Sequence, residues 1–287
     1  MKIEEVKLLP PLERLIYWIE KREEIRLKKE AGSLRPYSDD LILNTYRFCN
    51  VRRMDDRVSQ WILKNWYEPH YNHPNSLVAA ALARFFNFPA TLAAIGYPEV
   101  WDKEKIGAIV KERRSKGMQV FNGAYLVSTN GRVMDKVDYV LDRVDQFAHC
   151  QHWKHWIDTN SIQKSCESLQ TQYGFAGFMS GQIVCDLRWA LDGEWADKNS
   201  WAAIGPGSRR GMNRLLGRKL EYPLKQAQFV IELRELHEKL IKQLPASISS
   251  RMEAIDEQNS LCEIDKYSRA LLGEGRPKSN YTPYVGV

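Results

Sequence analysis

The sequence lacks the cysteine pattern of a disulfide-bonded protein. Its 287 residues include five cysteines, an odd number, and no two of them form a Cys-x-x-Cys pair. Such an unpatterned set is typical of a reducing compartment. The sequence also lacks an apolar run near the roughly 20 residues that span a membrane. Its charged start, with Lys2, Glu4 and Glu5, does not resemble a signal peptide. We therefore expect a cytoplasmic protein with no membrane partner.

Several motifs of nucleotide and metal chemistry are absent as well. The sequence has no P-loop, no Rossmann glycine pattern, no Gly-x-Ser-x-Gly and no zinc-finger spacing. Three histidines, His149, His152 and His155, follow each other at intervals of three residues. On a helix this spacing drifts around the axis, which disfavours binding of all three to one metal ion. We therefore expect no metal, no cofactor and no ATP in a Walker-type site.

The residues that are present indicate a helical protein. Apolar spacing and capping signals predict a mainly α-helical fold, a single helical domain in which an extension at 1–37 precedes a catalytic domain at 38–287. Residues 120–128, next to an Asn-Gly turn signal, are the best strand candidate, so at most a minor β-hairpin is expected. The predicted helices cover residues 12–30, 39–65 in two pieces with Ser38 as N-cap, 76–86, 89–95, 102–116, 136–157, 161–173, 175–192, 206–217, 223–244 and 261–272.

A glycine-rich turn opens one of these helices and predicts contact with an anion. Gly205 and Gly207 flank a proline, and Ser208, Arg209 and Arg210 follow. A turn without side chains at a helix N-terminus lets the backbone approach a phosphate closely, and the arginines add full charges. The net charge of +6 is compatible with such a polyanionic partner. The alternative is a tight turn between helices with solvated arginines.

A second candidate is the apolar segment 174–189, which carries Gln182, Asp186 and Arg188. Gln182 and Asp186 are four residues apart and share a helix face. A carboxylate in so apolar a helix is unfavourable unless it is paired or used. Asp186 is therefore either functional or paired with an arginine such as Arg188 or Arg53.

Two further clusters contain closely spaced charges. In the first, Arg53, Asp56 and Arg57 share a face if the segment is helical, and arginines so placed can hold phosphate oxygens. In the second, Asp265 and Arg269 form an i,i+4 pair, which ordinary helix stabilisation also explains. A solvated, salt-bridged face is the alternative for the first cluster.

Six blocks together resemble one known family. In order from about residue 40 to about residue 280 they read NVRRMDDR, FFNFPATL, FNGAYLVSTNG, GFAGFMSGQIVCDLRW, GPGSRRG and CEIDKYSR. They are similar to the alpha-glutamyl/putrescinyl thymine pyrophosphorylases, the amino acid:DNA transferases of phages that hypermodify thymine. The resemblance implies a helical core similar to helix-hairpin-helix DNA glycosylases, and the host cytoplasm as location.

The resemblance also implies a reaction. A separate DNA base kinase activates 5-hydroxymethyluracil in double-stranded DNA, and the transferase replaces the phosphate or pyrophosphate with the amine of a free amino acid. A flipped base, an arginine-stabilised leaving group and a carboxylate base are then expected. The implied catalytic residues are Asp186 as first choice of base, Asp56 as second, and Arg53 and Arg57 at the leaving group. The implied substrate-binding residues are Asn50, Gln182, Arg188, Asp265, Lys266 and Arg269.

Two other functions stay open at this point. A helix-hairpin-helix DNA glycosylase acting on a modified base would share the fold and the phosphate contact, although no lysine stands beside the glycine-rich turn. A non-catalytic DNA-binding module would tolerate loss of the aspartates. The residues also do not decide between direct displacement and a methide intermediate.

Overall fold

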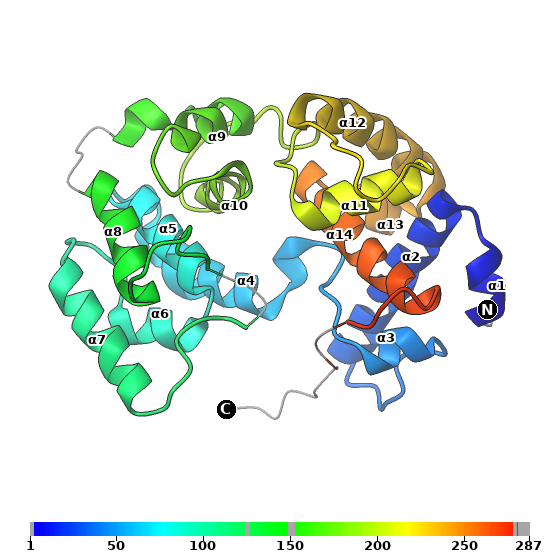
Figure 1. Ribbon diagram of the computed structural model, residues 1–287, viewed down its shortest axis with the longest axis horizontal. Coiled ribbons are helices and arrows are strands. Elements are labelled where there is room, and N and C mark those ends of the chain that lie inside the picture. The colour runs from blue at the N-terminus through cyan, green and yellow to red at the C-terminus, as the bar shows by residue number, and fades with distance from the viewer. Residues whose placement is uncertain (1–2, 124–126, 149–152, 278–279, 281–287) are drawn as a thin grey trace. The chain divides into compact units, whose positions relative to one another are not determined.

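The computed structural model describes residues 3–123, 127–148, 153–277 and 280, and it divides into two compact units (Figure 1). Unit 1 comprises residues 1–56 and 198–287, and unit 2 comprises residues 57–197. Unit 1 is thus built from both ends of the chain. The predicted boundary at residue 37 is a different division and stays a prediction.

The described residues are mainly helical, which confirms the predicted fold class. In the region of the predicted strand, residues 124–126 lie outside the described part, and the described neighbours form no strand. The β pairing seen among described residues is an isolated antiparallel bridge between Tyr46 and Asn280. Within the same residues, no helix is both long and apolar enough to cross a membrane.

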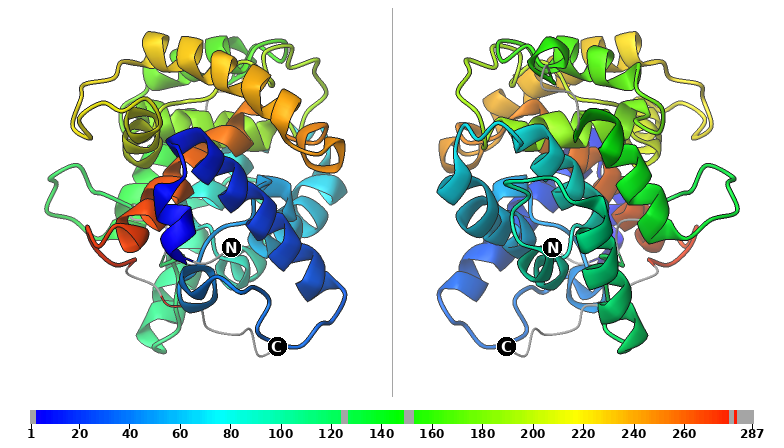
Figure 2. Two further views of the ribbon diagram at one scale, coloured as in Figure 1. Left: turned by 90° about the vertical axis from the view of Figure 1, so that its right-hand side faces the viewer. Right: turned by 90° about the vertical axis from the view of Figure 1, so that its left-hand side faces the viewer.

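Unit 1 is organised around its last helix, α14, which contacts α2, α3, α11 and α12 (Figure 2). Trp18 of α2 and Tyr267 of α14 both pack against the ring of Phe48, with centroid distances of 6.3 and 6.2 Å. Helix α2 is therefore part of this core. The elements of unit 1 are α1 (Ile3–Leu8), α2 (Pro11–Glu30), α3 (Leu41–Thr45), η1 (Arg53–Asp55), α11 (Pro206–Leu215), α12 (Gln226–Gln243), α13 (Ala246–Ser249) and α14 (Ala254–Leu271).

Two helix starts in unit 1 differ from the predictions. Helix α14 begins at Ala254 rather than near 261, because Asp256 accepts a hydrogen bond from the backbone N–H of Glu253 at 3.0 Å and caps the first turn. Helix α3 is capped by Asp40, whose Oδ1 accepts from two backbone N–H groups at 2.8 and 3.0 Å. Ser38 instead accepts a hydrogen bond from the N–H of Asp40 at 3.1 Å.

Unit 2 is organised around α5, which is buried along its whole length and contacts α6, α8 and α10. Within the predicted helix 136–157, α8 is described over Lys136–Ala148 and Trp153–Trp156 forms the 3-10 turn η4, whereas residues 149–152, with His149 and His152, lie outside the described part. The elements of unit 2 are α4 (Arg57–Ile62), η2 (Leu63–Tyr67), η3 (Glu68–His70), α5 (Ser76–Phe86), α6 (Pro89–Ile95), α7 (Lys103–Ser115), α8 (Lys136–Ala148), η4 (Trp153–Trp156), α9 (Ile162–Gln170) and α10 (Gly177–Leu187).

Two glycines of α11 allow its close packing on α14. A Cβ atom at Gly207 would lie 2.2 Å from the Sγ of Cys262, and one at Gly211 would lie 2.0 Å from the carbonyl oxygen of Leu261. The first obstacle is a side chain and the second is backbone, so only the first can be removed by substitution.

We expect Gly211→Ala to lower the free energy of unfolding by about 2 kcal/mol or more, because overpacking a helix contact forces the backbone apart. Gly207→Ala should destabilise less, and the added substitution Cys262→Ala should restore part of the loss. Urea unfolding of the three variants measures this. A Gly211→Ala protein as stable as the parent would contradict the packing argument.

Candidate functional site

The predicted site residues fall on both units. Unit 1 holds Asn50, Arg53, Asp56 and the residues of α11 and α14, whereas unit 2 holds Arg57 and the residues of α10. Each group is described within its own unit.

Asp186 of unit 2 lies in a closed charge pair. Its side chain is fully buried, Arg84 of α5 donates to both carboxylate oxygens, and the hydroxyl of Tyr67 donates to Oδ2 at 3.3 Å. Asp186 is thus paired with an arginine, as expected, and that arginine is Arg84, which was not among the named examples Arg188 and Arg53. Its role as first-choice base stays a prediction, as does that of Asp56.

The other predicted residues of α10 and α4 have different surroundings. Gln182 is buried in α10, whereas Arg57 is exposed at the start of α4. Arg188 follows α10 and its Nε donates to the carbonyl of Cys185 at 3.4 Å. Their roles toward a substrate stay predictions.

The glycine-rich turn is largely occupied by contacts within unit 1. Ser208 is fully buried, and its hydroxyl accepts from the N–H of Gly205 at 2.9 Å. Gly207 packs on α14. Contacts within unit 1 thus account for the positions of these three residues. Contact with DNA stays a prediction for all three, as it does for Arg209, which is exposed, and for Arg210, which also binds Asp265.

The predicted residues of α14 are mostly held by neighbouring side chains. Asp265 is 3% exposed and binds Arg210 and Arg214 of α11, each at 3.2 Å. Arg269 pairs with it at 3.4 Å, which confirms the expected i,i+4 pair. Lys266 lies 2.6 Å from the Oε2 of Glu263. This cluster ties α14 to α11, and its part in substrate binding stays a prediction.

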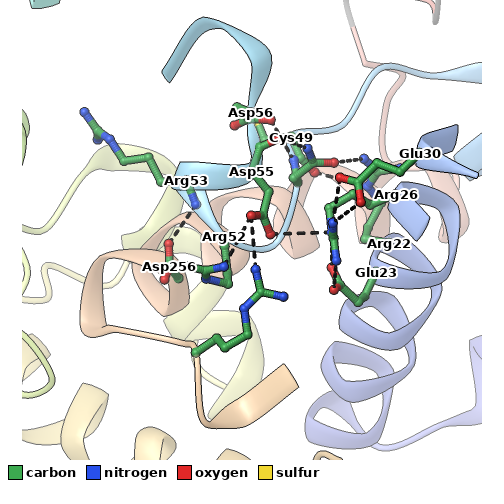
Figure 3. A network of polar contacts seen from close by, with 12 residues as sticks. Arg22, Glu23, Arg26, Glu30, Cys49, Arg52, Arg53, Asp55, Asp56 and Asp256 are labelled. Carbon is green, nitrogen blue, oxygen red and sulfur yellow. Dashed lines mark hydrogen bonds and ion pairs between the residues drawn. The ribbon is translucent and has the colours of Figure 1, made fainter. Parts of the chain in front are cut away.

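The segment 48–56 crosses between α2 and α14 and is held by both (Figure 3). Arg22 of α2 donates to the carbonyl of Cys49 at 3.1 Å and to the Oδ1 of Asn50 at 3.0 Å. From α14, Asp256 accepts the N–H of Arg53 at 2.8 Å. The segment is therefore fixed at several backbone positions.

This arrangement corrects the expected helix over the cluster. Arg53 lies in the short 3-10 turn η1, Asp56 is extended with φ −78° and ψ 134°, and Arg57 begins α4. The three residues do not share one helix face. The backbone leaves the helical conformation because Asp256 captures the N–H of Arg53, and Asp56 in turn accepts the N–H of Asn50 at 3.1 Å.

Three arginines near this segment form ion pairs with the carboxylate of Asp55. Its carboxylate lies 3.3 Å from Arg52, 3.5 Å from Arg26 and 3.4 Å from Arg251 (Figure 3). The side chain of Asp55 is only 10% exposed. Its charge is balanced inside the protein, which distinguishes Asp55 from its neighbour Asp56.

Asp56 is the other predicted base, and its carboxyl has a raised pKa. Burial raises the pKa of its half-buried carboxyl to about 6, and the opposing effects of the Asn50 N–H and Arg22 are weaker. A base whose pKa lies near the working pH is both largely ionised and able to accept a proton. Burial also raises the pKa of Asp256 to about 7, but that carboxyl is occupied by two backbone N–H groups.

Sequence reasoning missed three residues that shape these sites: Arg22, Arg84 and Asp256. A signal was present for Arg84, since it is the one charged residue in the apolar run SLVAAALARFF. Arg22 has no such signal, because it lies among many charged residues of α2. All of the net charge of +6 falls in unit 1, because acidic and basic residues balance over 57–197.

Comparison with known proteins gives a family and a relative. Residues 10–276 match the family described as "5-hmdU DNA kinase, helical domain". A protein of Bacillus phage SP10, named 5-hmdU DNA kinase, is 26% identical over 208 residues, which are 63% of this chain and 32% of the phage protein. The chain thus spans about a third of the length of that relative. No solved structure matches.

We expect Asp186→Asn to lower the free energy of unfolding by about 3 to 5 kcal/mol, because the buried Arg84 would lose the carboxylate charge that faces it. The matched control is Asp192→Asn, at an exposed carboxylate of the same unit, which should change stability by less than about 1 kcal/mol. Chemical denaturation measures both. Equal, small losses in the two variants would contradict the buried pair.

Asp56 should make stability depend on pH. Its pKa is higher in the folded chain, about 6, than the ordinary 3.8, so the folded state binds the proton more tightly. The stabilisation is present below about pH 4 and is lost as the pH rises through 6. Between pH 4 and pH 8 the free energy of unfolding of the parent should fall by about 2 kcal/mol relative to Asp56→Asn. A difference that does not vary with pH would refute the raised pKa.

Proposed function

Because the chain belongs to the family of the 5-hmdU DNA kinase helical domain, we propose that it acts in the hypermodification of thymine in phage DNA, on 5-hydroxymethyl-2′-deoxyuridine (5-hmdU). More specifically, we propose that it is the transferase that acts on the base after the kinase has phosphorylated it. Double-stranded DNA with the activated base, a free amino acid and a separate kinase are its proposed partners.

The observation that carries the proposal is the carboxyl of Asp56. It lies on a segment held from two sides, and its pKa is raised to about 6 by burial. An amino acid attacks as a free amine and must lose a proton, so the reaction needs a base of this kind. Simple DNA binding has no use for such a base. A DNA glycosylase that activates water with a carboxylate would use one, and the assay below separates it from the transferase.

The reaction balances with this one base. The bond between the 5-methylene carbon and the ester oxygen breaks, and its electron pair leaves with the phosphate or pyrophosphate. The amine nitrogen forms the new C–N bond, and its proton passes to Asp56. The growing charge on the leaving group is stabilised by cations, for which Arg53 remains the nearest predicted candidate. Direct displacement and a methide intermediate both need these groups.

A second candidate function follows from the name of the matched family. A helical domain that accompanies a kinase can recognise 5-hmdU DNA without transforming it. The positive charge gathered in unit 1 is compatible with this role. Such a module would bind DNA equally well with or without the carboxyl of Asp56.

The test uses DNA that contains 5-hmdU, phosphorylated by a 5-hmdU DNA kinase with ATP. The protein and a mixture of the standard amino acids are added, and the nucleosides are analysed by mass spectrometry. We expect a nucleoside heavier than 5-hmdU by an amino acid minus water. Released free base would instead indicate a glycosylase, and unchanged DNA that is nevertheless bound would indicate the recognition module.

The same assay tests the base. Asp56→Asn should lower the rate about 100-fold or more, whereas the control Asp39→Asn, at an exposed aspartate of unit 1, should not. In the parent protein the rate should rise as the pH passes through about 6, where Asp56 loses its proton. If the Asp56→Asn protein retained both the rate and this rise, Asp56 would not be the base.

A further inference from the structure

Two arginines and two tyrosines of unit 2 lie against one another, and none of the roles above uses them. The guanidinium carbons of Arg132 and Arg143 lie over the ring of Tyr173, at 4.6 and 4.7 Å from its centre. Arg143 also lies over the ring of Tyr139, at 5.5 Å. We name these four residues the Arg–Tyr cluster.

The cluster is assembled on one face of α8. Tyr139 and Arg143 are four residues apart in this helix and so share a face. The turn after α9 brings Tyr173 to them, since its carbonyl accepts hydrogen bonds from Arg143 at 3.4 Å and from Gln146 at 3.1 Å. Gly174 allows this approach, because its φ is +92° and a Cβ atom there would lie 2.4 Å from the Cδ of Arg143.

Arg132 is placed by the turn that the dipeptide Asn130-Gly131 signals in the sequence. Its N–H donates to the carbonyl of Thr129 at 3.1 Å, and the hydroxyl of Thr129 donates to the carbonyl of Arg132 at 2.9 Å. The side-chain amide of Asn130 donates to the hydroxyl of Tyr139 at 2.8 Å. The turn is therefore attached to the same helix face, with Arg132 exposed beside it.

Within the part of the chain that the structure describes, no carboxylate pairs with either arginine of the cluster. Arg143 is only 8% exposed, and its contacts are a carbonyl and two rings. The acids along α8 and just before it instead form ion pairs with cations of α7: Asp135 with Arg114, Asp138 with Lys111, and Asp142 and Asp145 with Lys103. A largely buried cation without a counter-charge is unfavourable. The cluster therefore favours a negatively charged partner.

The rings indicate which kind of anion fits. Tyr173 is 49% exposed, and Arg132 is exposed next to it. Unpaired nucleobases stack on aromatic rings and on guanidinium groups, and arginines also attract the phosphates of the same strand. A duplex keeps its bases stacked inside, and an acidic peptide has none, so both would use only the charges of the cluster.

We propose that the Arg–Tyr cluster binds an unpaired DNA strand, with a base stacked against Tyr173 and Arg132 and with phosphates attracted by the two arginines. An enzyme that extrudes a base from duplex DNA leaves such an unpaired segment. The inference goes beyond the proposed function, because it concerns unmodified DNA and lies in the unit that does not contain Asp56.

The test measures binding of the full chain to a fluorescent, unmodified oligothymidylate of about 12 nucleotides by anisotropy. Arg132→Gln and Tyr173→Leu should each weaken binding about tenfold, the effect of losing one stacked base. Arg132→Lys keeps the charge but removes the planar group, and should still weaken binding about threefold. The matched control is Arg114→Gln, at an exposed arginine of the same unit whose charge Asp135 balances, and should change binding less than twofold.

Four results would overturn the proposal. Equal losses in Arg132→Gln and Arg114→Gln would reduce it to a general effect of charge, and an Arg132→Lys protein that binds like the parent would remove the stacking. Tenfold losses of the same size for a duplex would indicate a backbone contact, and tighter binding of oligouridylate would assign the cluster to RNA.

Transfer to 5-hmdU DNA is measured separately on the same variants. The expected losses of binding in a protein without transfer activity would support the cluster and remove the transferase. Transfer by a protein whose binding the variants do not change would remove only the cluster.

Discussion

Unit 1 depends on the burial of polar side chains along α14. Removing such groups from water is unfavourable unless each finds a partner inside the protein. Asp256, Glu263, Asp265 and Tyr267 all do so, and together they bind three parts of the unit. The partners are the segment 48–56, the helix α11 and the N-cap of α3. One helix thus sets the positions of the elements around it through polar contacts as much as through apolar packing.

The same polar contacts of α14 fix the backbone of the candidate site. Glu263 accepts the N–H of Cys49, Asp256 accepts the N–H of Arg53, and Arg22 donates to the carbonyl of Cys49 and to the side-chain Oδ1 of Asn50. The backbone before Asp56 is therefore fixed without any ligand. Preorganised groups of this kind need no rearrangement when charge develops during a reaction. The same contacts explain why so many charged residues gather over a short stretch of sequence.

Periodicity was enough to predict helices whose apolar residues face one core, and α5 and α12 lie close to their expected ranges. It failed for the start of α14, where Asp256 and Glu257 are buried and no apolar pattern exists. It also failed for Arg53, because a hydrogen bond from a residue 203 positions away decides its conformation. Distant partners explain the remaining errors too. Asp186 was recognised as needing a cation, and the single charged residue in the apolar run 76–86, Arg84, was the signal that would have identified its partner.

The construction of unit 1 from both ends of the chain has a consequence for synthesis on the ribosome. Chains emerge N-terminus first, and domains generally fold as units as they appear. The first 56 residues, with the buried Trp18 of α2, are complete long before α14 exists. Unit 2 is finished in between and is free to fold first. Because α2 ends at Glu30 and α14 begins at Ala254, the apolar face of α2 lacks its α14 partner while most of the chain is synthesised.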